Sequence, residues 1–232
     1  MARNARTAGS PASILDHVRR SSTPIVVSLA VSTGIIGVAV AIKLCEGVPF
    51  RKLTGDPAEL THTPVYYGLL SNLGVVEWAA TAAIGLFVAI FAPKCEGEKG
   101  MRRYLLACGL LSTLLGFDDL FLVHERLIRY VLDVPEILMY LAYAAAAAAV
   151  MAWFRAEVMR TDLALLALTA IALGLSACAD EFMPRMRGGC LFEDGPKFVG
   201  TTCWLTYVLR TSTHTLARQR PFPDAPTTTA TV

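Results

Sequence analysis

The stretch VYYGLLSNLGVVEWAATAAIGLFVAIFAP, residues 65–93, decides the fold, because it is apolar along its length and carries a single charged residue, Glu77. An α-helix rises about 1.5 Å per residue, so about 20 apolar residues cross a hydrocarbon core about 30 Å thick. This stretch is long enough to do so. It therefore predicts a helix that spans a membrane.

Further apolar runs lie along the chain at residues 24–44, 104–123, 135–154, 163–179 and, shorter and less apolar, 195–210. Polar stretches that contain Gly and Pro separate most of them, as is typical of loops. The sequence therefore predicts an all-α fold, a polytopic membrane helix bundle with about six transmembrane helices.

The composition agrees with a membrane protein. Hydrophobic residues make up 54% of the 232 positions and charged residues 17%, and the mean hydropathy is +0.51, whereas a soluble domain carries about 25% charged residues. These values argue against a soluble enzyme, a nucleic-acid-binding module, a disordered chain and a disulfide-stapled mini-protein. We therefore expect contact with membrane lipid and none with nucleic acid.

The distribution of Lys and Arg predicts the orientation. The larger share of the 21 basic residues falls in segments that lie on the cytoplasmic side if both termini are cytoplasmic, as the positive-inside rule requires. We therefore divide the chain into a basic cytoplasmic segment (1–23), a six-span membrane domain (24–212) and a disordered cytoplasmic tail (213–232). The predicted location is the bacterial inner membrane, with a polar site toward the extracytoplasmic side.

Several carboxylates fall inside the predicted spans, where they are costly. Glu77 lies about 15 Å along its helix from the outer boundary, near the centre of the hydrocarbon core, and Asp118 lies about 20 Å from the inner boundary. A charged side chain at this depth costs at least about 2.5–3.5 kcal/mol, and such residues mark functional sites by default. The topology therefore predicts a polar site in the outer half of the bundle.

The candidates for this site come from four spans and their ends. The candidate catalytic residues close the third span and are Asp118, Asp119, His124 and Glu125. The candidate metal ligands are these four together with Glu77, Asp180, Glu181, Glu193 and Asp194. Ser71 and Asn72 are further polar candidates, and Lys197 is predicted to be a counter-charge or an anion contact.

Three kinds of function fit these residues. Carboxylates with an imidazole suit a divalent metal, without distinguishing Zn, Fe, Mn, Ca and Mg, and a metal favours a hydrolase or another enzyme that modifies a lipid or other membrane-borne substrate. Membrane carboxylates also form proton relays, which favours a cation or proton transporter or its accessory subunit, although the inner halves of the spans are nearly free of acids. The third alternative is a structural or assembly subunit held together by interhelical polar contacts. The sequence fixes neither the oligomeric state nor the disulfide pairing among Cys45, Cys178 and Cys190.

The segment FDDLFLVHE, residues 117–125, followed by EDGPKF at 193–198, resembles a group of uncharacterised bacterial multi-pass membrane proteins. These proteins carry an acid pair, a His-Glu pair at the end of a span (DDxxxxHE) and a later Glu-Asp-Gly motif that opens the last span. The resemblance brings no activity with it. A second resemblance is to the ceramidase-like superfamily of membrane hydrolases, and it implies zinc-site roles for Ser71, Asp118 and His124. The chain departs from that superfamily because it lacks a His-x-x-x-His pair on a late helix.

Overall fold

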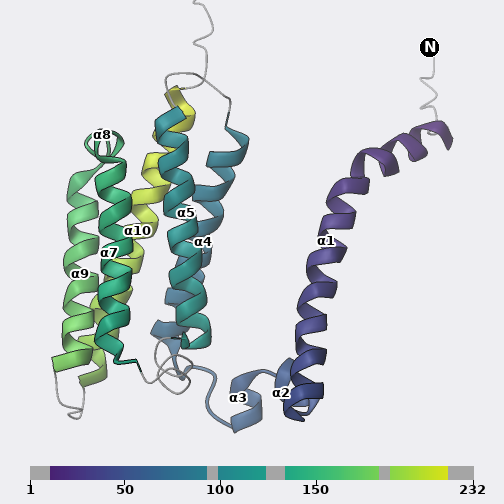
Figure 1. Cartoon of the computed structure of the whole chain (residues 1–232), viewed down its shortest axis with the longest axis horizontal. Coiled ribbons are helices and arrows are strands. Elements are labelled where there is room, and N and C mark those ends of the chain that lie inside the picture. Colours follow the sequence, from purple (N-terminus) through teal and green to yellow (C-terminus); the bar gives the residue numbers. More distant parts are fainter. Residues whose placement is uncertain (1–10, 93–98, 124–133, 183–188, 219–232) are drawn as a thin grey trace, which may run out of the picture. The chain divides into compact units, whose positions relative to one another are not determined.

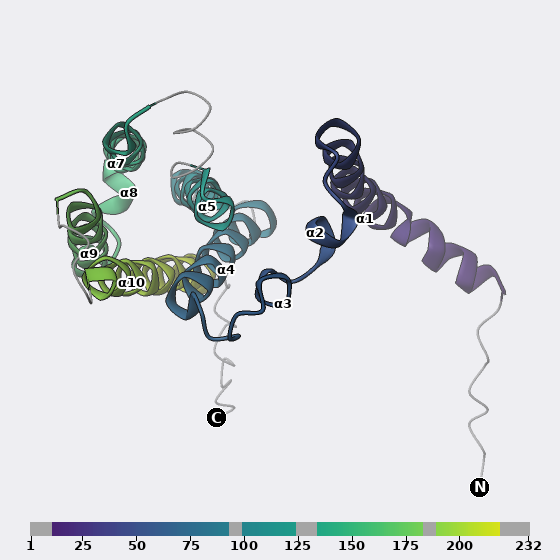
Figure 2. The same ribbon diagram turned by 90° about the horizontal axis from the view of Figure 1, so that it is seen from below.

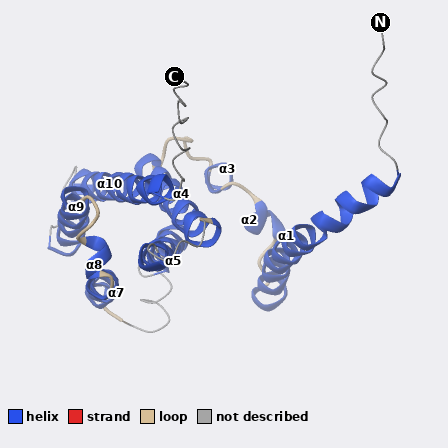
Figure 3. Ribbon diagram, turned by 90° about the horizontal axis from the view of Figure 1, so that it is seen from above, coloured by secondary structure: helices blue, strands red, loops and turns tan. Residues whose placement is uncertain are grey.

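A computed structural model of the chain describes residues 11–92, 99–123, 134–182 and 189–218, with side chains from 26 onward except those of 182, 189 and 190. Within these residues every regular element is a helix (Figure 3). The chain divides into two compact units, Met1–Tyr67 and Gly68–Val232. Each unit is described by itself.

The first unit contains α1 (Pro11–Glu46), α2 (Phe50–Thr54) and α3 (Pro57–Thr61). Residues Val26–Glu46 of α1 are long and apolar enough to cross a membrane. Helix α1 begins at Pro11, so it includes part of the segment predicted to precede the first span. Helix α3 is capped by Asp56, whose side chain accepts the backbone N–H of Ala58 at 2.8 Å, a contact that satisfies an otherwise unpaired donor of the first turn.

The second unit is a bundle of long helices (Figure 1). It consists of α4 (Leu69–Phe91), α5 (Lys99–Phe121), α7 (Glu136–Trp153), α8 (Arg155–Val158), α9 (Leu163–Phe182) and α10 (Gly189–Arg218). The long helices follow one another around the bundle in the order α5, α4, α10, α9, α7 (Figure 2). We call the end where α4, α7 and α10 begin the outer end, after the predicted orientation, and the opposite end the inner end.

The predicted all-α fold is confirmed. In the described part of the chain, five helices are long and apolar enough to cross a membrane, namely Val26–Glu46 of α1, α4, α5, α7 and Leu163–Glu181 of α9. The predicted sixth span, 195–210, lies within α10, which does not meet that criterion. Helix α10 is also longer than predicted at both ends, and its last turns include residues 213–218 of the predicted tail.

The core of the bundle lies where α4, α5 and α10 meet. Tyr104, Leu105 and Cys108 of α5 and Tyr207 and Val208 of α10 are fully buried. Helices that pack in lipid gain from close approach of their backbones, which small residues allow. Here the close approach joins α4 to α5, where Gly85 faces Gly109.

We expect alanine at either of these two glycines to destabilise the bundle. A Cβ at Gly85 would lie 3.0 Å from the backbone oxygen of Leu105, and one at Gly109 would lie 2.9 Å from Cγ of Leu86. Such overpacking costs about 1–3 kcal/mol, and the free energy of unfolding in detergent measures it. The matched control is Gly174→Ala on α9, which meets no atom within 4 Å and should stabilise the helix by about 0.5–1 kcal/mol. Equal effects at all three positions would contradict the close α4–α5 packing.

Candidate functional site

The central contact of the outer half is an ion pair between α5 and α10. The amino group of Lys197 donates to Oδ1 of Asp119. Asp119 is buried, with 7% of its surface exposed, and Lys197 is half-buried. Helix α10 brings the lysine to this depth directly after Pro196, a residue that lacks the N–H of a regular helical turn. The predicted role of Lys197 as a counter-charge therefore has a defined partner.

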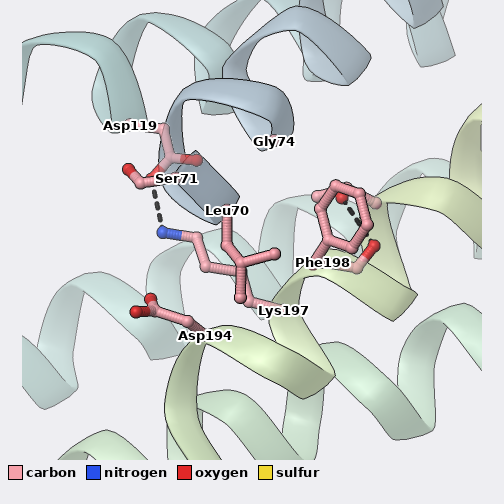
Figure 4. A pocket seen from close by; sticks show the side chains of 8 residues that line it. Leu70, Ser71, Gly74, Asp119, Asp194, Lys197 and Phe198 are labelled. Carbon is pink, nitrogen blue, oxygen red and sulfur yellow. Dashed lines mark hydrogen bonds and ion pairs between the residues drawn. The ribbon is translucent and has the colours of Figure 1, made fainter. Parts of the chain in front are cut away.

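The second oxygen of Asp119 differs from the first. Its Oδ2 atom is buried and accepts no hydrogen bond from any described residue. A small cavity of about 10 Å³ lies beside the ion pair, and Ser71, Asp194 and Thr201 contribute to its lining. Such a volume holds about one water molecule. Figure 4 shows the Lys197 amino group directed at Asp119, with Asp194 on the other side of the lysine chain.

Glu77 reaches α10 one turn further along. Both of its carboxylate oxygens accept hydroxyl hydrogen bonds, from Thr201 at 2.5 Å and from Thr202 at 2.8 Å. Thr201 also lines the cavity beside Asp119, so the same residue contacts Glu77 and borders the Asp119 site. Lys197 and Thr201 are four residues apart and share one face of α10. This face therefore gathers carboxylates from both α4 and α5.

Two further carboxylates, the buried Asp118 and the partly buried Asp180, contact tyrosines of α7. The Tyr143 hydroxyl hydrogen-bonds Asp118 of α5, and the Tyr140 hydroxyl donates to Asp180 of α9 at 2.5 Å. The two tyrosines are three residues apart, so they lie on one face of α7. Asp118 and Asp119 thus contact different helices although both are buried. The contacts described for Glu77, Asp118, Asp119 and Asp180 thus go to different partners.

The other predicted residues are distributed as follows. Asp194 and Ser71 line the small cavity, Glu193 is partly buried and takes part in an interaction, and Asn72 and Glu181 are exposed. His124 and Glu125 lie outside the described residues. Among the described side chains, Cys45 and Cys178 form no disulfide, and the side chain of Cys190 lies outside the described residues, so the pairing among the three cysteines stays open.

Among the described side chains, no three from His, Cys, Asp and Glu gather closely enough to hold a metal ion. The carboxylates instead accept hydrogen bonds from hydroxyl groups and a lysine. Lys197 places a positive charge beside Asp119. This charge compensates the negative charge of the carboxylate, a role that a bound metal ion would otherwise take. The metal prediction also includes His124 and Glu125, which lie outside the described residues, so it stays a prediction.

Sequence reasoning missed the hydroxyl donors. Thr201, Thr202, Tyr140 and Tyr143 have no sequence signal of their own, because their roles depend on which helices are neighbours. It also missed buried polar contacts in the inner half of the bundle. There the Trp204 indole donates to Ser112 at 2.8 Å, and the Tyr207 hydroxyl lies 2.6 Å from that of Tyr104 and 2.8 Å from that of Thr161. For these inner contacts, the spacing of Trp204, Tyr207 and Thr211 along one helix face was the available signal.

Comparison with known proteins gives one family. The model of a domain of unknown function, DUF8692, matches residues 25–211, which is most of the chain, and the chain therefore belongs to this family. The match includes every described helix of the bundle in whole or in part. Neither the curated proteins nor the solved structures gave a match.

We expect Lys197→Met to destabilise the bundle more than Lys197→Met combined with Asp119→Asn. Removal of one partner leaves a buried charge uncompensated, which costs about 3–5 kcal/mol, whereas neutral partners avoid that penalty. The free energies of unfolding of the two single variants, the double variant and the unmodified protein form a double-mutant cycle. Additive effects in this cycle would contradict a direct Asp119–Lys197 interaction.

Proposed function

We propose that this member of the DUF8692 family is an ion-linked membrane protein, a proton or cation transporter or its accessory subunit. In this proposal the Asp119–Lys197 pair binds and releases a proton. One observation carries the proposal: Oδ2 of Asp119 is buried without a hydrogen-bond partner among the described residues, beside a cavity the size of one water molecule.

The state of Asp119 favours exchange over a purely structural role. A buried ion pair that only holds helices together is expected to have its remaining lone pairs satisfied, because an unsatisfied polar atom is costly in a medium of low dielectric constant. A carboxylate that lines a water-sized space can instead accept a proton from a water molecule bound there. Protonation of Asp119 removes its charge and weakens its attraction to Lys197, so proton binding is linked to the position of α10.

The lining of the cavity supports exchange with the outer end. Ser71 lies in the first turn of α4 and Asp194 in the second turn of α10, and both elements begin at that end. Thr201 lines the cavity, and its hydroxyl donates to Glu77. A hydroxyl both donates and accepts, so it can pass a proton between two oxygens. Asp119 and Glu77 are then two acceptors of one site.

Polar contacts continue from Thr201 toward the inner end, but they include a group that cannot accept a proton. The Trp204 indole only donates, so it interrupts a chain of exchangeable groups between Thr201 and Tyr207. The arrangement therefore supports an outward-facing site, and transport requires a second arrangement of α10. Pro196 lies next to Lys197, where a missing backbone hydrogen bond allows the helix to bend.

A second candidate is metal-dependent chemistry on a lipid or other membrane-borne substrate. It is favoured by the spacing of Asp118 and Asp119 from His124 and Glu125 at the end of one span. In that case Oδ2 of Asp119 is the oxygen available as a ligand, and the metal would activate water or polarise a carbonyl or phosphoryl oxygen of the substrate.

Proton exchange is tested with the full chain in liposomes that enclose a pH-sensitive dye, under an imposed membrane potential. We expect faster acidification than in protein-free liposomes, and we expect Asp119→Asn to reduce the protein-dependent rate at least about tenfold because it removes the proton acceptor. The matched control is Asp180→Asn at the same end of the bundle, where the carboxylate is bonded to Tyr140 and should leave the rate unchanged.

Infrared spectroscopy distinguishes proton binding from transport. The carbonyl band of a protonated carboxylic acid should change with pH in the unmodified protein, and one component should be lost in Asp119→Asn but kept in Asp118→Asn. A dye response equal to that of empty liposomes, together with a band that Asp119→Asn leaves unaltered, would overturn the proposal.

Metal-dependent chemistry predicts a different result. Elemental analysis of the purified protein should give a divalent metal at near-stoichiometric level, and Asp119→Asn should lower that level at least about tenfold because it removes a charged ligand. A metal-free preparation that still exchanges protons would reject this second candidate and leave the first in place.

A further inference from the structure

A larger cavity lies at the inner end of the bundle, away from the Asp119 site. Its volume is about 500 Å³, within the range of about 300–1,000 Å³ typical of small-molecule sites. Its walls come from the beginning of α5, the turn between α8 and α9, the first residue of α9 and the last turns of α10. Three separate segments of the chain therefore build it.

The charge of the lining favours an anion. Arg160, Arg210 and Arg218 face the cavity, and His214 is a fourth nitrogen-bearing side chain, whereas Asp162 is the one acid among the lining residues. Asp162 forms an ion pair with Arg210, with 3.3 Å between its Oδ2 and Nε of the arginine, and so partly neutralises this guanidinium. A guanidinium has five N–H donors in a fixed fork, which matches the oxygens of a phosphate group.

The depth of the cavity places it where lipid headgroups lie. Leu163, which contributes to its lining, begins the apolar helix α9, and the buried Met101 belongs to the first turn of α5. The cavity thus lies at the boundary between the charged turn and the apolar helices. Large apolar side chains are exposed beside it: Met159 is 69%, Leu163 41% and Leu216 36% exposed.

We propose that this cavity binds the phosphate group of an acidic phospholipid, with the acyl chains on the exposed apolar surface next to Leu163. Basic pockets between membrane helices are suited to anionic headgroups. The apolar surface beside the arginines distinguishes a lipid from free phosphate, which would gain nothing from it. The inference is independent of the proposed ion-linked function, because it uses none of the residues of the Asp119 site.

The test uses the full chain purified in detergent, with lipid binding measured by native mass spectrometry and by thermal unfolding. Phosphatidylglycerol should bind and raise the unfolding temperature, whereas phosphatidylcholine and inorganic phosphate should do so weakly or not at all. Arg160→Gln and Arg218→Gln should each lower the affinity for phosphatidylglycerol about fivefold, because one basic residue near the surface contributes about that much.

One control variant is expected to leave the affinity for phosphatidylglycerol unchanged, and the other is expected to raise it. Arg103→Gln removes an exposed guanidinium from α5 that does not line the cavity, and it should leave the affinity unchanged. Asp162→Asn removes the single acid of the lining, so it should strengthen binding. Equal losses for Arg103→Gln and Arg160→Gln, weaker binding by Asp162→Asn, or an equal response to inorganic phosphate would each overturn the lipid assignment.

Discussion

The bundle depends on the compensation of charge at Asp119. A carboxylate in the outer half of a membrane helix is costly unless a cation or several donors meet it, and Lys197 meets this one from a helix far away in the sequence. The same contact brings α10 against α5, while Glu77 and the hydroxyls of Thr201 and Thr202 hold it against α4. The polar contacts thus act together with the apolar core in deciding which helices are neighbours.

The carboxylates differ in how many of their oxygens have a hydrogen-bond or ion-pair partner among the described residues. This difference distinguishes a structural role from proton exchange. Glu77 has a donor on each oxygen, as expected of a contact that holds two helices together. Asp119 has one oxygen in an ion pair and one beside a water-sized cavity, as expected of a group that exchanges its ligand. On α7, Tyr143 hydrogen-bonds Asp118 of α5, and Tyr140 hydrogen-bonds Asp180 of α9. These contacts attach α7, which has few buried residues, to the bundle.

The fold was predictable because length and hydropathy determine a membrane helix almost by themselves. The prediction of the site was partial for a reason specific to helices. The acids of 77, 118 and 119 are visible as charges in apolar runs, and Lys197 is visible as the nearby counter-charge. Their pairing is not visible, because it depends on which faces of α4, α5, α7 and α10 meet. Thr201 and Tyr143 look like ordinary packing residues until the neighbouring helix is known. Arg160, Asp162, Arg210 and Arg218 likewise form a cavity only after α9 and α10 have packed.

Helix α10 has a consequence for biosynthesis. Its buried face carries Lys197, Thr201, Thr211 and Thr215, and the helix as a whole is too polar to meet the criterion for a membrane span. A segment of this kind partitions poorly from the translocon into lipid by itself, because each uncompensated polar group opposes transfer. Glu77 and Asp119 are synthesised before it and are themselves unfavourable in lipid. In a bilayer, the last helix and its acidic partners would therefore insert most favourably together.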